Sequence, residues 1–292
     1  MLHPSSLSHT LIAAALMCLP LLSHGADYRF GVFAGSASKD NQSELREEFK
    51  PLADYLAKET GSNIKLEISQ SFKNMERRLN NASRFALLLA PAQVTADAIE
   101  DGYNPVAKWN KPLYGLFVIA VDKPYGNIAA LKGARLGLAS RDTAVGPLCM
   151  DSLSKTKLRT DRDFASVYEG KFMDVLTKEL KTKSLDAICI SPIAWKTLNA
   201  EAPGAFKVLG ETARIPGFAF SLDNALSTQE KKSLTAVLAS IGAKPEGKAA
   251  LAAITGSASG ATATLPASSA EYTNANRLLE QGKQLYDQQM PK

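Results

Sequence analysis

The sequence predicts an α/β fold of two lobes arranged as a clamshell, in which each lobe is a mixed or parallel sheet flanked by helices. Strand-like and helix-like segments alternate along the chain, which is the pattern of sheets covered by helices. The alternation occurs twice, before and after a turn-forming break at 122–126. Two extended segments, near 113–123 and 212–222, join the two runs, and we expect them to be the crossover strands of the clamshell.

The elements of the first run follow from the spacing of apolar residues. Leu45, Phe49 and Leu52 recur at helical intervals, and Gly61 stands where a helix would end. By contrast, Phe85–Leu89 is a continuous apolar run, typical of a central parallel strand. In order, we expect a strand at 28–33, a helix at 45–61, a strand at 63–69, a helix at 75–79, a strand at 85–89, a helix at 92–100 and a strand at 113–121.

The second run repeats the alternation and ends in a helical tail without strands of its own, which we expect to cover the first lobe. Strands are expected at 134–139, 163–168, 185–190 and 206–209, intervening helices at 145–158, 172–180 and 193–199, and tail helices at 228–241, 246–254 and 269–286. The chain is thus expected to divide into a signal peptide at 1–26, the first part of lobe 1 at 27–121, lobe 2 at 122–213, and a return to lobe 1 with C-terminal helices at 214–292.

The N-terminal segment has the features of an export signal. Leu11–Leu22 is almost wholly apolar, and this run is too short for a membrane span but suits the core of a signal peptide. Small residues follow at Ser23, Gly25 and Ala26, so cleavage is expected near Ala26, although no Lys or Arg precedes the apolar run. A buried N-terminal helix and a lipid anchor at Cys18 are the alternatives.

Composition argues against an enzyme. All three histidines lie within residues 1–26, so the mature chain would have neither Ser-His nor Cys-His nucleophilic machinery, nor the commonest transition-metal ligand. The Ser-x-x-Lys tetrads at 36–39 and 152–155 lack the companion motifs of the hydrolases that use them. The net charge of +5 comes without a basic stripe interleaved with aromatics. We therefore expect no catalysis, no cofactor, no metal and no nucleic-acid partner.

Cys149 and Cys189 remain after removal of the signal segment. An even count in an oxidising compartment is consistent with one disulfide, and two buried small apolar side chains are the alternative. We expect the two residues to lie close together in the second lobe, because a helix start and the end of a neighbouring strand meet at one edge of a sheet.

Candidate ligand-binding residues follow the strand ends or lie in the crossovers, because ligands of open α/β sheets bind beyond the carboxyl ends of the strands. These candidates are Ser36, Lys39, Gln93, Tyr114, Thr143, Gly146 and Ser191. Arg141 and Lys171 are further candidate cations for an anion, whereas Asp142 would oppose one. Helix capping, hinge packing and solvated loops are the alternative roles for these residues.

Several segments resemble motifs of a known family. They are Phe-Lys-Pro-Leu-Ala-Asp-Tyr-Leu at 49–56 with Gly61, Leu-Leu-Leu-Ala-Pro at 87–91, Ile-Ala-Ala-Leu-Lys-Gly-Ala-Arg-Leu-Gly at 128–137, Ile215-Pro216 and Glu271-Tyr272. In order and spacing they resemble the PhnD-like phosphate, phosphite and phosphonate solute-binding proteins of ABC importers. The resemblance covers nearly all of the mature chain and implies the type 2 periplasmic-binding fold.

The resemblance also implies a site and a role. The family's ligand motif is a Ser-Thr-Ser-Gly-like turn that begins a second-lobe helix, and here 140–147 reads Ser-Arg-Asp-Thr-Ala-Val-Gly-Pro. Thr143 and Gly146 match in kind, the paired serines are missing, and Asp142 adds a negative charge. The implied function is a monomeric periplasmic protein that carries a small anionic ligand to an inner-membrane permease. The alternative is a sensing or accessory protein of the same fold that signals to a membrane receptor.

Overall fold

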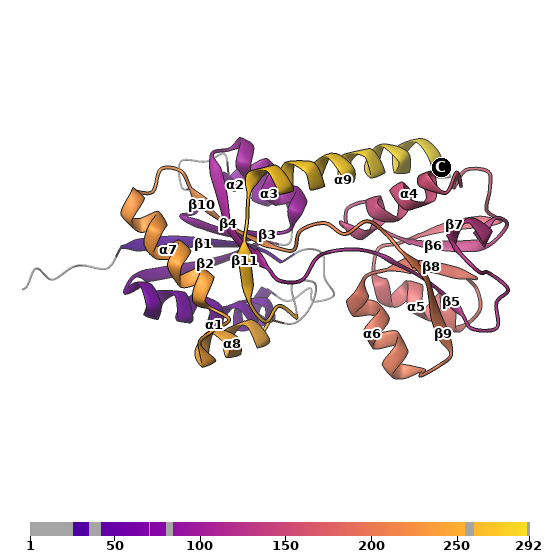
Figure 1. The fold of residues 1–292 in the computed structure, drawn as a ribbon, viewed down its shortest axis with the longest axis horizontal. Coiled ribbons are helices and arrows are strands. Elements are labelled where there is room, and N and C mark those ends of the chain that lie inside the picture. The colour runs from indigo at the N-terminus through magenta and orange to yellow at the C-terminus, as the bar shows by residue number, and fades with distance from the viewer. Residues whose placement is uncertain (1–25, 35–41, 70, 80–83, 255–259, 291–292) are drawn as a thin grey trace, which may run out of the picture.

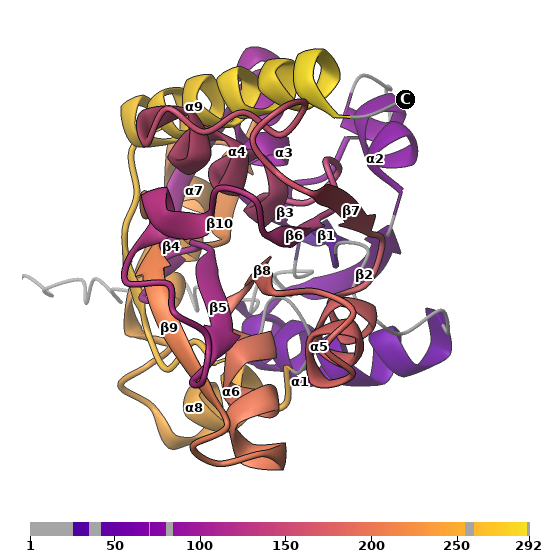
Figure 2. The same cartoon turned by 90° about the vertical axis from the view of Figure 1, so that its right-hand side faces the viewer.

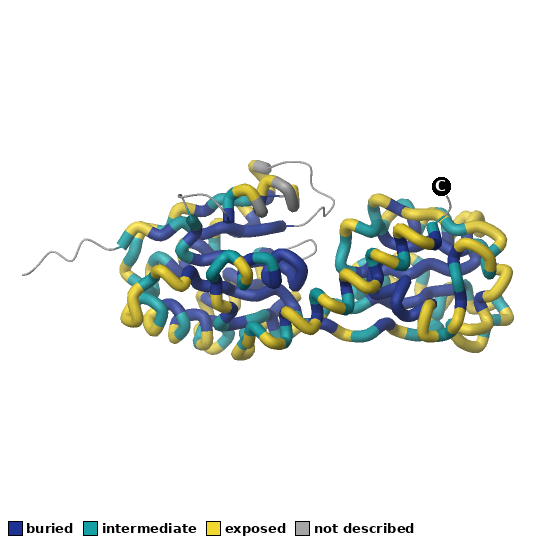
Figure 3. Tube along the Cα trace, turned by 90° about the horizontal axis from the view of Figure 1, so that it is seen from above, coloured by how far each residue is buried: buried dark blue, intermediate teal, exposed yellow. Residues whose placement is uncertain are grey.

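The structure is a computed structural model that describes residues 26–34, 42–69, 71–79, 84–254 and 260–290. Two bodies lie side by side along the long axis of the molecule, and each has a sheet flanked by helices (Figure 1). Figure 3 shows that each body has its own buried interior. The predicted fold class, two α/β lobes with mixed sheets, is confirmed.

The first lobe is built on a six-stranded sheet of order β11-β4-β10-β3-β1-β2. Its strands are β1 (Asp27–Phe33), β2 (Asn63–Ser69), β3 (Leu87–Ala90), β4 (Tyr103–Trp109), β10 (Ala219–Asp223) and β11 (Thr264–Pro266), and its helices are α1 (Gln42–Thr60), α2 (Phe72–Leu79), α3 (Ala92–Glu100), α7 (Thr228–Ser240) and α8 (Pro245–Ala252). Leu87 and Leu89 pack in one apolar cluster, and Leu88 and Ala90 in another. Successive side chains of a strand point to opposite faces, so a strand covered on both faces is apolar throughout.

The second lobe is built on a five-stranded sheet of order β7-β6-β8-β5-β9. Its strands are β5 (Leu116–Ala120), β6 (Arg135–Ala139), β7 (Ser166–Gly170), β8 (Ala187–Ile190) and β9 (Phe206–Glu211), its helices are α4 (Val145–Lys155), α5 (Met173–Lys181) and α6 (Pro192–Glu201), and a 3-10 turn, η1, covers Ile128–Leu131. The alternation recurs in β8, where Ala187 and Cys189 pack on one side and Ile188 and Ile190 on the other.

One predicted boundary is wrong. The strand expected to close the first part of lobe 1 at residue 121 is β5, which pairs with β8 and β9 in the second sheet. A short apolar strand is equally suited to either core, so hydrophobicity does not indicate which sheet it joins. The strand that the first sheet uses instead is β4, which was not predicted and contains Pro105, a residue that disfavours strand assignments.

The C-terminal helix α9 (Ser269–Gln289) also differs from the prediction. It was expected to cover the first lobe, yet it lies over α3 of the first lobe and α4 of the second (Figures 1 and 2). The Tyr272 hydroxyl donates to the carbonyl of Gly217, 2.7 Å away, and the Tyr286 hydroxyl donates to the carbonyl of Ala139. A helix of this length spans about 30 Å, enough to bridge both lobes.

The two crossover segments are hydrogen-bonded to each other between the lobes. Leu113 and Ile215 exchange backbone hydrogen bonds of 3.0 and 2.9 Å. Next to them, the N–H of Gly115 donates to the hydroxyl of Thr212 over 2.8 Å, and the N–H of Thr212 donates to the carbonyl of Gly115 over 2.9 Å. The lobes are therefore joined by a paired two-strand connection rather than by two independent linkers.

Candidate functional site

The two sheets present the carboxyl ends of their parallel strands to each other. In the first sheet, Ala90 at the end of β3 pairs with Ala219, where the chain re-enters from the second lobe. In the second sheet, Ile190 at the end of β8 pairs with Leu116, where the chain arrives from the first lobe. Since the crossovers leave both sheets at these edges, the loops after β3, β6 and β8 all face the region between the lobes.

Gln93 lies in the first turn of α3, directly after β3. Its side chain is 8% exposed, and its carboxamide oxygen is buried without a hydrogen-bond partner among the described residues. Pro91 provides no side-chain cap, so the first N–H groups of α3 also lack a capping acceptor. A buried acceptor without a partner is costly, so this position is suited to a ligand that supplies a hydrogen-bond donor, such as a hydroxyl group.

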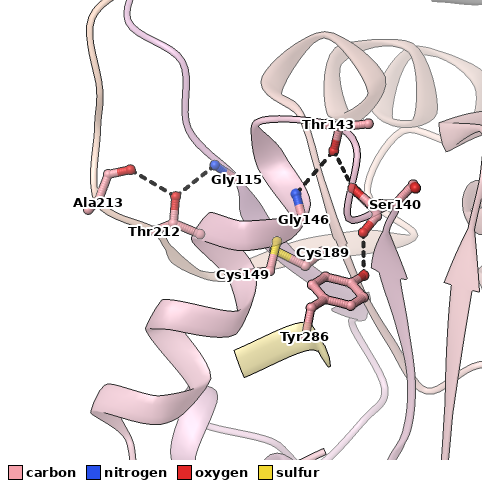
Figure 4. The surroundings of a disulfide bond; sticks show 10 residues. Gly115, Ser140, Thr143, Gly146, Cys149, Cys189, Thr212, Ala213 and Tyr286 are labelled. Carbon is pink, nitrogen blue, oxygen red and sulfur yellow. Dashed lines mark hydrogen bonds between the residues drawn. A yellow bond between two sulfur atoms is a disulfide. The ribbon is translucent and has the colours of Figure 1, made fainter. Parts of the chain in front are cut away.

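Thr143 and Gly146 form the turn between β6 and α4 (Figure 4). The Thr143 hydroxyl donates to the carbonyl of Ser140 over 2.8 Å and accepts from the N–H of Gly146 over 3.1 Å. Its only proton is thus used within the turn, whereas we had expected it to be offered to an anion. A Cβ on Gly146 would lie 2.4 Å from the carbonyl oxygen of Ser140, so glycine allows the helix to start this close to the strand end.

Replacing Thr143 by Val is expected to lower the free energy of unfolding by about 1 kcal/mol, the usual effect of losing a capping hydroxyl. The isosteric side chain keeps the packing but leaves the Gly146 N–H unpaired, and the Ser140 carbonyl keeps only the hydrogen bond from the Thr143 N–H. Urea denaturation measures the change, and Thr143→Ser, which retains the hydroxyl, is the matched control. Equal stability of both variants would contradict the capping role.

The remaining candidates lie at the same facing edges. The Ser191 hydroxyl caps α6 by accepting from the N–H of Ala194 over 3.3 Å. Tyr114 lies in the first crossover, and the guanidinium of Arg214 in the second crossover lies 4.3 Å from the centre of its ring. Tyr114 is thus held by a cation–π contact between the crossovers. Ser36 and Lys39 fall outside the described residues.

The cysteines lie close together, as we predicted from their places at one sheet edge, and of the two alternatives the disulfide is the one formed. Cys149 in α4 and Cys189 in β8 form a disulfide with a Cα–Cα distance of 6.3 Å. The bridge is fully buried behind the turn of Thr143 and beside the Gly115–Thr212 pair of the crossovers (Figure 4). It fastens the start of α4 to the sheet at the edge that faces the first lobe.

The charges around the 140–143 turn are mainly negative. Arg141, expected to be a cation for the ligand, hydrogen-bonds through two nitrogens to Asp287 of α9, at 2.7 and 2.8 Å. These hydrogen bonds hold the pKa of Asp287 below its usual value. Asp142 is largely exposed, whereas Lys171 lies 5.3 Å from the ring centre of Phe172 and makes no ion pair with the described residues.

Glu169 was missed by the sequence reasoning. It lies next to the end of β7, and one of its carboxylate oxygens accepts from the Ser140 hydroxyl at 2.8 Å and from the Arg141 N–H at 2.9 Å. The strand expected at 163–168 ends immediately before it. Glu169 therefore follows a strand end, the same sequence signal that indicated Gln93 and Ser191.

Comparison with known proteins decides the family. Residues 34–272 match the model of the family described as ABC transporter, phosphonate, periplasmic substrate-binding protein. The chain belongs to this family. It is a family of transport proteins rather than enzymes, as the composition led us to expect, and it is periplasmic. No protein of the curated set matches the chain closely enough in sequence to be counted.

Solved structures share the fold of this phosphonate-binding family member at low identity. XAC2383 from Xanthomonas citri bound to ATP has a TM-score of 0.68 at 16% identity, over 90% of this chain and 99% of that one. PhnD1 from Prochlorococcus marinus in complex with methylphosphonate has 0.66 at 15%, over 87% and 98%. A binding protein component of an ABC phosphonate transporter from Pseudomonas aeruginosa has 0.63 at 16%, over 89% and 87%.

The signal segment expected at 1–26 lies, apart from Ala26, outside the described residues. Among the residues that are described, no helix is long and apolar enough to cross a membrane. Within the same ranges, no group of His, Cys, Asp and Glu side chains is placed to hold a metal ion.

Proposed function

We propose that this chain, after removal of its signal peptide, is the periplasmic substrate-binding component of an ABC importer. It holds a small anion of the phosphate or phosphonate class between the facing edges of its two sheets and presents it, as a monomer and without nucleic acid, to an inner-membrane permease. Family membership supports the role. The observation that carries the site is the buried Gln93 side chain, whose carboxamide oxygen has no partner among the described residues, at the uncapped start of α3.

The physical basis is hydrogen bonding to an anion in a region shielded from water. The first N–H groups of a helix and the nitrogen of a side-chain amide are donors suited to phosphate or phosphonate oxygens, and the amide oxygen can accept from a phosphoryl hydroxyl. Facing strand ends allow both lobes to contact one ligand, so closure is favoured by contacts made only when the lobes approach. Gln93, Tyr114, Thr143, Gly146 and Ser191 at these edges, with Ser36 and Lys39, remain the predicted lining.

The test is titration calorimetry of the mature protein with methylphosphonate, phosphate, phosphite, sulfate and ATP. We expect saturable binding of a phosphorus oxyanion, with methylphosphonate as the first probe because a structural neighbour holds it. Transport by the reconstituted permease, stimulated by the loaded protein, separates delivery from signalling. Absence of binding to every probe would overturn the assignment to this ligand class.

Replacing Gln93 by Met is expected to weaken binding of the phosphorus oxyanion about tenfold or more, because a hydrogen bond to a charged group contributes about 1.5–3 kcal/mol. Stability should be unchanged or slightly higher, since Met has a similar size and no protein hydrogen bond is lost. Calorimetry and urea denaturation of the same preparations measure the two effects.

Gln289 offers the matched control for this variant. It is 6% exposed, and its carboxamide oxygen accepts from the N–H of Thr160, so it is a buried glutamine that has a partner. Gln289→Met should lose stability and keep its affinity for the ligand. If Gln93→Met binds the ligand with wild-type affinity, Gln93 does not contact the ligand and the prediction is wrong.

A further inference from the structure

The turn after β6 has the donors of an anion site, and they are already occupied by the chain's own carboxylate. β6 and β7 run parallel, with Leu138 opposite Glu169, so the side chain of Glu169 lies beside the end of β6. One carboxylate oxygen of Glu169 accepts from both the Ser140 hydroxyl and the Arg141 N–H. A hydroxyl and a backbone N–H that converge on one oxygen are an arrangement typical of anion binding.

The surrounding charges do not neutralise this carboxylate. Glu169 forms no ion pair with any described residue, and its two hydrogen bonds come from uncharged donors. The nearby guanidinium of Arg141 is shared by two other carboxylates, Asp287 at 2.7 Å and Asp142 at 3.8 Å, so its single positive charge is outnumbered at this turn. A multiply charged anion bound beside this turn would therefore meet both repulsion and competition for the same donors.

We propose that Glu169 is a specificity-determining residue: an internal carboxylate that competes with the ligand for the Ser140 hydroxyl and the Arg141 N–H. It lowers affinity for dianions more than for monoanions. The inference rests on the proposed function, because it requires that the ligand be an anion held between the lobes. The alternative role for Glu169 is a structural brace between β6 and the turn, which would contribute stability and leave ligand selection unaffected.

Two substitutions separate charge from hydrogen bonding. Glu169→Gln retains an acceptor oxygen and removes the charge, whereas Glu169→Ala removes both and leaves the two donors free. The control is Glu201→Gln, which makes the same charge change on α6, where Glu201 pairs with Lys181 away from the turn. The probes are methylphosphonate, titrated as the dianion, and methanesulfonate, which is a monoanion of similar shape.

We expect Glu169→Ala to bind methylphosphonate about tenfold tighter than the wild type, because the substitution removes a like charge and frees two donors for hydrogen bonds to a charged ligand. The increase in affinity should be smaller for Glu169→Gln than for Glu169→Ala. In both variants it should be smaller for methanesulfonate than for methylphosphonate, and Glu201→Gln should bind both probes as the wild type does. Binding by Glu169→Ala alone, with none by the wild type, also supports the inference.

Two results would overturn it, and they are distinguishable. If the wild type binds methylphosphonate and Glu169→Ala binds it equally or more weakly, the competitor role is wrong and the proposed function stands. A loss of stability in Glu169→Ala would then identify the brace. If no protein of the set binds either probe, the inference fails. The anion assignment fails with it only when phosphate, phosphite, sulfate and ATP also do not bind.

Discussion

Replacing Cys149 and Cys189 together by alanine is expected to lower the free energy of unfolding by about 4 kcal/mol. The bridge joins residues separated by 40 positions, so its loss restores a large amount of chain entropy to the unfolded state. This is the largest loss of stability expected among the substitutions proposed for this chain. Urea denaturation of the oxidised wild type and the double variant measures the difference.

The control is reduction of the same proteins. When a thiol reductant is present during unfolding, the free energy of unfolding of the wild type should drop to that of the double variant. The reductant should not change the stability of the double variant. A difference below about 1 kcal/mol between the oxidised wild type and the double variant would show that the unfolded chain is already constrained without the bridge.

The bridge also supports the connection between the lobes. A Cβ on Gly115 would lie 3.1 and 3.2 Å from the sulfurs of Cys189 and Cys149, and 3.0 Å from a methyl group of Thr212. The crossover backbone thus packs directly on the disulfide (Figure 4). We infer that the bridge fixes the position of the start of α4 relative to the crossover pair.

Local patterns predicted most of the architecture because each element has its own periodic signal. Apolar spacing predicts α1, β3 and β8. The expected meeting of a helix start and a neighbouring strand end at one sheet edge places Cys149 and Cys189 close together. These inferences depend only on neighbours in sequence and on general properties of parallel sheets.

The features that were missed depend on partners far away in the chain. The spacing of apolar residues predicts neither which sheet β5 joins nor that α9 crosses both lobes. The pairing of Glu169 with Ser140 joins residues 29 positions apart, and that of Arg141 with Asp287 joins residues 146 positions apart. The sequence indicates an anion site at this turn, but these long-range contacts show that its donors are already hydrogen-bonded within the chain.

The last expected result concerns the contact of α9 with the second lobe. Gly282 is buried where α9 crosses α4, and a Cβ there would lie 2.1 Å from the carbonyl oxygen of Pro147 and 2.6 Å from its carbonyl carbon. Both atoms belong to the backbone and have little room to move. Gly282→Val should therefore lower the free energy of unfolding by about 3 kcal/mol, near the upper end of the usual cost of overpacking.

Gln281→Val is the matched control, because it adds the same branched side chain on the exposed side of the same turn of α9. It should change stability by only a few tenths of a kcal/mol, as surface substitutions do. Hydrogen exchange locates the effect: Gly282→Val should speed exchange in α4 and in the second half of α9, while α7, which packs in the first lobe, keeps its protection. Equal stability of the two variants would show that α9 tilts away from Pro147 at little cost. In that case the helix is a loose cover over the second lobe, and the bidentate pair of Arg141 with Asp287 must hold its end in place.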